Sequence, residues 1–427
     1  MRRVNVYRVI ADRALLLLLR IIADRCARLW NTAQYICRQR FLAGEKVPSY
    51  ARLCSLLKEH EAYRALPSDI AQEVLKMVRE SWNSFFKNRK NYRAGKIPEP
   101  PGLPGYCKDR RTGHRLIRCI PIKCTRSYSI HGSEFSMTAP SDLSSDRLRM
   151  RVRGCTRWNG KPGRAELLWD AARNVWYLHQ SVKVNAPTRR PRRRRWAAVD
   201  RGARIPLALA IEGVPEVLVF RARELWKDFL YWSRQIAGLQ SRLRTRGMHA
   251  SRELRRMYAR RRERLLAAYR GLARTVVDIL KRHGVTDLIV GDLTGIRENM
   301  DFGPLNELVH NFWSFAELLR ILKDACERAG IRVHEKPEGG TSSHCVLCGE
   351  DAARPIRSRV LCRNGHELHA DINGALNLLY REPEVRARVE GRPGWRTLRW
   401  NGHRWVPIES ACRVPSPAAT SRLPPGG

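Results

Sequence analysis

The stretch "WAAVDRGARIPLALAIEG", residues 196–213, decides the fold of the second half of the chain. It predicts an apolar strand that ends at Asp200, a tight turn at Arg201 and Gly202, and a second apolar strand. Another buried strand is predicted in "TDLIVGDL", residues 286–293, and helical patterns lie between and after these strands. This alternation is typical of an α/β domain.

Three aspartates stand at the ends of these elements. Asp200 and Asp292 each end an apolar strand, and Asp371 opens the helical stripe of "HADINGALNLL", residues 369–379. Strand ends and helix N-termini converge on one edge of such a sheet, where ligands bind. Carboxylates there suit Mg²⁺ or Mn²⁺, and two such ions support phosphodiester cleavage. Taken singly, each Asp is a cap or turn residue, as Asp371 would be at its helix start; their joint placement favours a metal site.

A second group of ligand residues lies in "HCVLCGEDAARPIRSRVLCRNGH", residues 344–366. Cys345 and Cys348 form a C-x-x-C knuckle, and Cys362 with a nearby histidine would close a tetrahedral Zn²⁺ site across a β-hairpin. Free thiols are the alternative. The position that matches a second C-x-x-C is glycine, so the fourth ligand is expected to be a histidine: His366, with His369 and His344 as alternatives.

The charge of the chain points to a polyanionic partner. Among 427 residues, 81 are Lys or Arg and 41 are Asp or Glu, which gives a net charge of +40 and a pI near 10.8. The basic residues are spread along the whole length, which suits a large phosphate-tracking surface. Because 43% of the residues are hydrophobic, the chain is expected to bury real cores, and nucleic acid is the predicted partner.

The chain is predicted to be an intracellular protein of prokaryotic type, cytoplasmic and nucleoid-associated, with no membrane partner. Its apolar stretch "ALLLLLRIIA", residues 14–23, is broken by Arg20 and is too short to span a bilayer. It lacks the uninterrupted core and cleavage site of a signal peptide. Most of the 12 cysteines stand singly in apolar contexts, which predicts buried thiols.

The predicted secondary structure changes along the first half of the chain. Residues up to about 95 show mainly helical periodicity, and residues 115–186 read as short β runs separated by turns. The basic stretch "PTRRPRRRRW", residues 187–196, follows. Its arginines are those of a solvated linker that also clamps phosphates: Arg189, Arg190, Arg192, Arg193, Arg194 and Arg195.

Taken together, these motifs resemble the TnpB family, also called OrfB, the transposon-encoded relatives of type V CRISPR effector nucleases. The order and spacing of the matching stretches are specific over roughly residues 1–385. The stretches are "LWNTAQYICRQRF" and "LPSDIAQEVLKMVRESWNSFFK" for a helical recognition lobe, "AAVDRGARIPLALA", "LIVGDLTGIRE" and "ADINGALNLL" for the three RuvC motifs, and "TSSHCVLCG" for a zinc ribbon.

The resemblance implies a multidomain α+β protein: a helical recognition lobe with a small β-barrel, then an RNase H-like (RuvC) α/β domain with an inserted zinc ribbon. The expected boundaries are 1–186 for the lobe, with barrel segments at about 1–12 and 115–186, 187–196 for the linker, 197–340 and 370–385 for the RuvC-like domain, 341–369 for the ribbon, and 386–427 for a basic, partly disordered tail. It also implies Mg²⁺ or Mn²⁺ at Asp200, Asp292 and Asp371, Zn²⁺ in the ribbon, and a guide RNA and a double-stranded DNA target as partners.

One departure from the family pattern concerns the second acid. The family places a Glu directly before the residue that matches Asp292, and Gly291 occupies that position here. Alternate strand residues face opposite sides of a sheet, so Asp292 would point away from the site. A bulge at Gly291 would turn it back, or Glu298 in the following loop would replace it.

Three functions therefore compete. The first is an RNA-guided DNA endonuclease, the second a nuclease-inactive RNA-guided DNA-binding protein, which Gly291 favours, and the third a transposition accessory protein that binds DNA without a guide. RNA of defined sequence that copurifies with the protein would separate the third from the first two. The sequence does not predict an oligomeric state.

Overall fold

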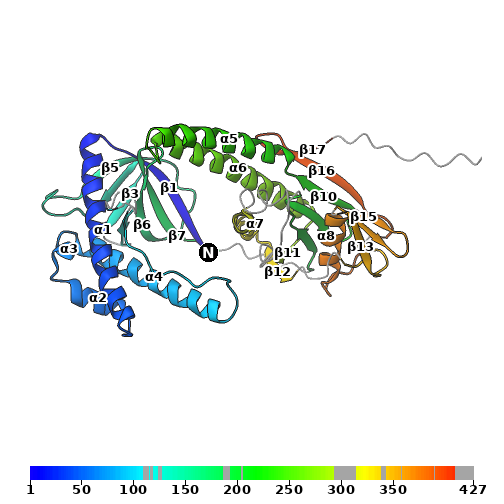
Figure 1. Cartoon of the computed structure of the whole chain (residues 1–427), viewed down its shortest axis with the longest axis horizontal. Coiled ribbons are helices and arrows are strands. Elements are labelled where there is room, and N and C mark those ends of the chain that lie inside the picture. Colours follow the sequence, from blue (N-terminus) through cyan, green and yellow to red (C-terminus); the bar gives the residue numbers. More distant parts are fainter. Residues whose placement is uncertain are drawn as a thin grey trace, which may run out of the picture. The chain divides into compact units, whose positions relative to one another are not determined.

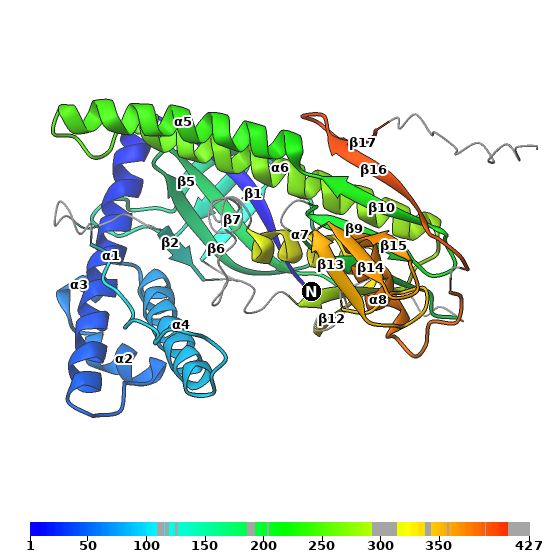
Figure 2. The same cartoon turned by 45° about the vertical axis from the view of Figure 1, so that its right-hand side comes forward.

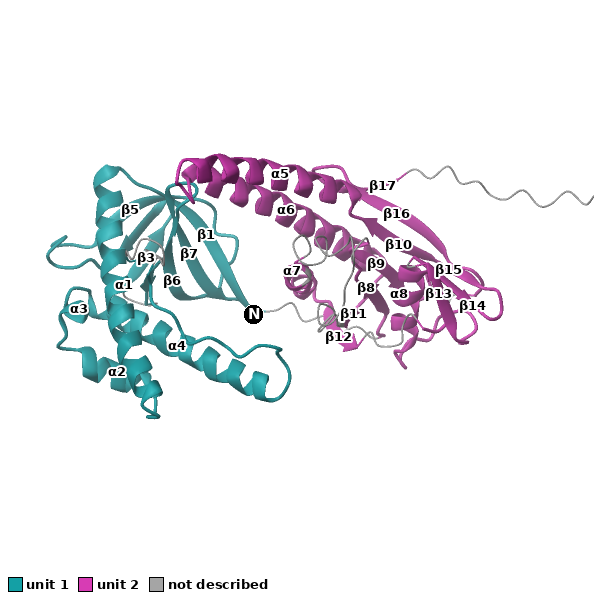
Figure 3. Cartoon of the chain, in the orientation of Figure 1, with its two compact units in different colours: residues 1–185 teal, residues 186–427 magenta. Residues whose placement is uncertain are grey.

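The structure is a computed structural model, and it falls into two compact units that are described separately (Figure 3). Unit 1 is Met1–Asn185 and unit 2 is Ala186–Gly427. The structure describes residues 1–108, 115, 119–123, 127–185, 193–202, 205–292, 314–337, 343–356, 358–388 and 390–408, with the side chains of Asp292 and Phe315 left out.

Unit 1 is built on a seven-stranded antiparallel sheet in the order β2-β6-β7-β1-β5-β4-β3. The N-terminal strand is central: β1 pairs with β7 from Arg2 opposite Lys183 onward, and with β5 on its other side. Alternate residues of β1 are buried, so one face of the sheet meets the core. The strands are β1 (Arg2–Ile10), β2 (Cys119–Ile122), β3 (Tyr128–His131), β4 (Glu134–Met137), β5 (Leu148–Arg153), β6 (Lys161–Asp170) and β7 (Val175–Lys183).

Four helices complete the core of unit 1: α1 (Arg13–Leu42), α2 (Tyr50–Leu57), α3 (Glu61–Arg64) and α4 (Ser68–Arg93). Helices α1 and α4 contact the sheet at β2, and α2 and α3 pack on these two helices (Figure 1). The Asp12 side chain caps α1 by accepting a hydrogen bond from the Leu15 amide at 2.8 Å. In the core, the Trp82 indole donates to the Gln34 carboxamide at 2.8 Å, and both side chains are fully buried. No helix among the described residues has the length and apolar character needed to cross a membrane.

An asparagine of α1 holds the segment that follows α4. The Asn31 side chain accepts from the Cys107 amide at 2.7 Å and donates to the Cys107 carbonyl at 3.4 Å. One carboxamide thus satisfies both backbone groups of one residue in an extended segment, which fixes that segment on the helix.

Unit 2 contains a seven-stranded mixed sheet in the order β12-β11-β8-β9-β10-β16-β17. Strand β8 is parallel to β11, and β11 is parallel to β12, whereas β8 and β9 form an antiparallel hairpin. The predicted strands at 196–213 and 286–293 are thereby confirmed. The strands are β8 (Trp196–Asp200), β9 (Leu207–Ile211), β10 (Glu216–Arg221), β11 (Asp287–Asp292), β12 (Arg332–Pro337), β16 (Gly394–Trp400) and β17 (Trp405–Pro407).

Helices cover both faces of this sheet. On one face, Ala197 and Val199 of β8 pack in a core with α5 (Arg223–Thr245), α6 (Arg252–Arg282) and α7 (Phe315–Arg328). On the other face, Trp196 and Ala198 pack against α8 (Ala370–Tyr380). Helices α5 and α6 form a long hairpin (Figure 2). The alternation along β8 therefore divides the unit into two layers of core, and α8 lies on the face that Asp200 shares with Ala198.

The prediction of a tail from residue 386 is wrong for residues 394–407. Strand β16 pairs in parallel with β10, and β17 pairs with β16 at the edge of the sheet (Figure 1). The reason is burial at alternate positions: Leu398, Trp400 and Trp405 all join the core of the α6 face. The Trp405 indole also donates to the Ala268 carbonyl of α6 at 3.1 Å.

A small three-stranded antiparallel sheet lies between β12 and α8 in the chain. It consists of β13 (Ala352–Ile356), β14 (Arg359–Cys362) and β15 (Glu367–His369). Its apolar core is minimal, with Leu368 beside Cys345 and Cys362. Strand β15 runs directly into α8, so this sheet is attached to the helix that carries Asp371.

Candidate metal sites

The carboxylates of Asp200 and Asp371 each lie against a glycine: Asp200 against Gly374, and Asp371 against Gly202. A Cβ atom placed on Gly374 of α8 would lie 2.7 Å from Oδ2 of Asp200, and one on Gly202 would lie 3.0 Å from Oδ1 of Asp371. Each acid thus packs on a glycine of the segment that carries the other acid. This reciprocal packing brings the end of β8 and the first turn of α8 to one point, as expected for ligands at a strand end and a helix start.

The environment of Asp371 opposes a negative charge on its carboxylate. Burial raises the pKa of the Asp371 carboxyl, and the nearby His369 and Arg354 offset this only in part. Arg201, which is 4% exposed, donates a hydrogen bond to the Gly291 carbonyl at 2.7 Å and ties the end of β8 to β11. A divalent cation would remove the penalty of two carboxylates held together, so the donor set fits the predicted Mg²⁺ or Mn²⁺.

The interpretation of Asp371 as a helix cap is wrong. His369 is the N-cap of α8, and its Nδ1 atom accepts a hydrogen bond from the Asp371 amide at 3.3 Å. The Asp371 carboxylate lies in the first turn and is 26% exposed. The apolar stripe of the helix is buried as predicted: Ile372, Ala375, Leu376 and Leu379.

Gly291 lies level with Asp200 in the sheet. Strand β11 pairs with β8 up to Val290 opposite Val199, and the next step brings Gly291 to Asp200. The β11–β12 register runs without a shift to the end of both strands, so these pairings contain no bulge. Ile289 packs on the α8 face, and alternation gives Gly291 that same face. The side chain of Asp292 and all of Glu298 lie outside the described residues.

The predicted zinc ligands converge. One ligand atom from each of four residues lies within 4.8 Å of the others: Cys345, Cys348, Cys362 and His366. The Sγ atoms of Cys348 and Cys362 are 3.7 Å apart, and Nδ1 of His366 lies 3.4 Å from Sγ of Cys362. A tetrahedron with Zn–S bonds of about 2.3 Å has edges of about 3.8 Å, so the Cys₃His set fits Zn²⁺.

One ligand thiol, that of Cys362, has a lowered pKa that favours metal binding, whereas burial raises the pKa of the Cys345 thiol. Burial alone would raise the pKa of Cys362, but hydrogen bonds from the His366 and Asn364 amides lower it to about 7, with contributions from Cys348 and Cys345. A thiolate is the form that binds zinc. The two alternative histidines have other roles, because His344 pairs with Asp351 at 3.2 Å and His369 caps α8.

Comparisons with known proteins found two matching family models and one similar viral protein. The OrfB_IS605 family model, described as a probable transposase, matches residues 179–297, and the Cas12f1-like TNB domain model matches residues 315–378. The TnpB-like protein ORF457 of Acidianus two-tailed virus is 29% identical over 411 residues, covering 88% of this chain and 86% of that protein. The chain is therefore similar to proteins of the TnpB (OrfB) family.

The fold of the chain is also similar to that of a solved structure. A Cas12f1–sgRNA–target DNA complex matches with a TM-score of 0.61 and 14% identity, over 87% of this chain and 83% of that one. The stretch matched by the first family model includes Asp200, and the stretch matched by the second includes Asp371 and the whole Cys₃His set.

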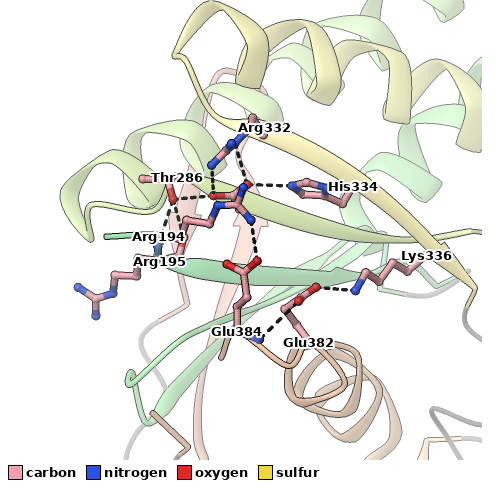
Figure 4. A network of polar contacts seen from close by, with 9 residues as sticks. Arg194, Arg195, Thr286, Arg332, His334, Lys336, Glu382 and Glu384 are labelled. Atoms are coloured by element: carbon pink, nitrogen blue, oxygen red, sulfur yellow. Dashed lines mark hydrogen bonds and ion pairs between the residues drawn. The ribbon is translucent and has the colours of Figure 1, made fainter. Parts of the chain in front are cut away.

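Two of the predicted linker arginines contact other residues of unit 2. The Arg194 guanidinium pairs with Glu384 at 2.7 Å (Figure 4). The Arg195 guanidinium donates to the Glu212 carbonyl at 3.1 Å. Both groups therefore have partners within the fold. Arg189, Arg190 and Arg192 lie outside the described residues, and Arg193 is described and exposed.

A buried polar network missed by sequence reasoning lies at the start of β11 (Figure 4). Asp287 is fully buried and accepts hydrogen bonds from Thr286, Arg332 and His334 at 2.7 to 3.0 Å. Burial alone would raise the pKa of Asp287, but these partners hold it below its ordinary value. The only signal in the sequence is an acid at the start of an apolar strand, which equally suits a turn.

Proposed function

We propose that this protein is an RNA-guided DNA endonuclease of the TnpB type, and that Asp200, Asp371 and Asp292 form its metal-binding site. The observation that carries the proposal is the reciprocal packing of Asp200 on Gly374 and of Asp371 on Gly202. Bound Mg²⁺ or Mn²⁺ would supply the activation of water and the stabilisation of the leaving oxygen. The Cys₃His set would hold Zn²⁺ and order the ribbon that leads into α8.

The partners follow from charge and fold. A net charge of +40 over the whole chain suits a phosphate backbone, and the Cas12f1 structure with the same fold holds an sgRNA and a target DNA. A guide RNA and a double-stranded DNA target are therefore the partners proposed here. In this arrangement the chain's own residues position the scissile strand, while base pairing with the guide reads the sequence.

The test is cleavage by the protein copurified with its own RNA. We expect Mg²⁺-dependent cutting of a DNA library with randomised flanks, and we expect Asp200→Ala to abolish it while leaving RNA and DNA binding in place, because that substitution removes a carboxylate and no basic group. Cutting that survives in Asp200→Ala would refute the assignment of the site.

A second candidate, a nuclease-inactive RNA-guided DNA-binding protein, is favoured by Gly291. The position level with Asp200 on the α8 face has no side chain, and the register of β11 shows no bulge. Target binding without cutting in the wild-type protein would support this candidate. In that case Gly291→Glu should restore Mg²⁺-dependent cutting, because it adds a carboxylate on the face that Asp200 occupies.

A further inference from the structure

Three sides of helix α8 make three different sets of contacts. Its apolar stripe packs in the core, and Asp371 and Gly374 lie on the side of the acid pair. At 100° per residue, Asn373 and Asn377 share a third side, one turn apart. This third side contacts the zinc ribbon.

Both asparagines bind the backbone of the first zinc knuckle. The Asn373 carboxamide accepts from the Val346 amide at 2.9 Å and donates to the His344 carbonyl at 2.9 Å. Asn377 donates to the same His344 carbonyl at 2.8 Å. His344 and Val346 are the two neighbours of Cys345, so the hydrogen bonds hold the chain on both sides of a ligand that is 1% exposed.

The same turn of helix touches the acid pair. Asn373 is fully buried, and the next residue, Gly374, is the one on which the Asp200 carboxylate packs. Only one peptide bond therefore separates the residue that holds the knuckle from the residue that sets the distance between α8 and β8.

We propose that Asn373 is a positioning residue that couples zinc occupancy of the ribbon to divalent-metal binding at the acid pair. This inference rests on the metal assignments of the proposed function. Without zinc, the knuckle loses the ligand bonds that fix Cys345, and the buried Asn373 carboxamide loses its fixed partners. An unsatisfied buried amide is costly, and a shift of the first turn of α8 that relieves it moves Gly374 away from Asp200.

The chemistry of the side chain makes the inference specific. A carboxamide provides an acceptor and a donor, which match the Val346 amide and the His344 carbonyl. Asn373→Asp keeps the acceptor and turns the donor into a second acceptor that faces a carbonyl, and Asn373→Ala removes both. Asn377 binds the knuckle through its donor to the His344 carbonyl and leaves the Val346 amide to Asn373, so Asn377→Ala should weaken the coupling less.

The test uses reciprocity, because a coupling between two binding sites acts equally in both directions. Mn²⁺ is the probe. In the full-length protein we expect saturating Mn²⁺ to tighten zinc binding, measured at equilibrium by competition with a chromogenic chelator, by about fivefold or more. Zinc loading should tighten Mn²⁺ binding, measured by electron paramagnetic resonance, by the same factor. In Asn373→Ala and Asn373→Asp both factors should fall to near one, with one zinc still bound per chain.

Asn31→Ala is the matched control, because Asn31 holds the Cys107 backbone in unit 1 with the same paired geometry; it should leave the coupling unchanged. A factor of one in the wild-type protein, or an unchanged factor in the Asn373 variants, overturns the inference. If Asn373→Ala fails to retain zinc, a reduced factor in Asn377→Ala supports the inference and an unchanged factor overturns it. Mn²⁺ binding that is absent, or unaffected by Asp200→Ala, would refute the proposed acid site instead.

Discussion

At the scale of single residues, the acid pair depends on a glycine in an unfavourable place. Glycine inside a helix costs about 1 kcal/mol relative to alanine, yet Gly374 lies inside α8, where an added Cβ would lie 2.7 Å from the Asp200 carboxylate. The absence of a side chain is what allows the strand end and the helix to approach.

We expect Gly374→Ala to weaken Mn²⁺ binding and Mg²⁺-dependent cleavage by at least about tenfold, because the methyl group displaces the Asp200 carboxylate by more than metal ligation tolerates. The matched control is Gly238→Ala in α5, where an added Cβ meets nothing within 4 Å. That variant should raise the free energy of unfolding by about 0.5 to 1 kcal/mol and leave metal binding unchanged. Wild-type Mn²⁺ affinity in Gly374→Ala would contradict the role given to this glycine.

The buried Asp287 should make the free energy of unfolding depend on pH, and the sign of this dependence follows from its pKa. Its pKa is lower in the folded protein than the unfolded value of 3.8. Its contribution to stability is therefore fully present above about pH 4 and is lost as the pH falls through the folded pKa. Asp287→Asn should lower the free energy of unfolding by about 2 kcal/mol near neutral pH.

Urea unfolding from about pH 7 down to about pH 2.5 measures this effect. The difference between the wild-type protein and Asp287→Asn should shrink as the pH falls below about 4. A difference that stays constant with pH would show that the loss comes from packing and not from the charge of the Asp287 carboxylate.

Sequence reasoning identified residues at the ends of elements and missed residues inside them. Asp200 and Asp371 were predictable because each stands where an apolar run begins or ends. Asn373 was not, since an asparagine in a helix ordinarily faces solvent and its partners lie almost thirty residues away. The choice of His366 over His369 was open for a related reason: both imidazoles can bind zinc, and only the three-dimensional course of β15 into α8 assigns one to capping.

At the scale of elements, the ribbon sheet β13-β14-β15 depends on its metal. The buried residues of its apolar cluster are Leu368, Cys345 and Cys362, with the partly buried Val346, Leu347 and Ala352 packed against them. A core of that size does not offset the entropy that folding removes.

We expect zinc removal, or Cys362→Ser, to increase amide hydrogen exchange in β13, β14 and β15 by more than about tenfold, while the sheet of unit 1 keeps its protection. Mass spectrometry of peptic fragments measures both regions in one experiment. Unchanged exchange in the ribbon after chelation would show that hydrogen bonds and packing suffice to hold it.

Elements with a regular pattern were predictable, and those with a mixed pattern were not. Helices α5 and α6 lie where a helical pattern was predicted between the two buried strands, and the structure places a break between them at residues 246–251. Strand β16 alternates arginines with apolar residues in "GWRTLRW", which made the basic segment look like a tail. Its partner β10 lies far away in the sequence, so no local signal indicated that β16 would pair with the edge of β10.

At the scale of the whole molecule, the surplus of positive charge should appear as salt dependence. The α5–α6 hairpin carries exposed arginines together with exposed aromatic rings, Tyr231 at 56% and Tyr258 at 40%. Arg260 lies over the Trp232 ring at 5.1 Å. Arginine and aromatic side chains in this combination suit phosphate contact and base stacking.

We expect nucleic-acid affinity to fall linearly with the logarithm of salt concentration. The variant Arg234→Gln/Arg255→Gln/Arg260→Gln should reduce that slope by up to about three, because each phosphate that a basic side chain neutralises adds roughly 0.9 to the slope. Arg320→Gln is the control, because Glu317 already neutralises Arg320 at 2.9 Å. A slope that is unchanged in the triple variant would show that other basic residues of the chain bind the phosphates.

The central place of β1 in the sheet of unit 1 has a consequence during synthesis. Strand β1 leaves the ribosome before its partners β5 and β7, and β7 ends at Lys183. At about 5 to 20 residues per second, β1 waits roughly 9 to 35 s for its last partner. During that interval its backbone is an open edge, and Arg2, Arg3 and Arg8 put charge along it, which discourages pairing between nascent chains.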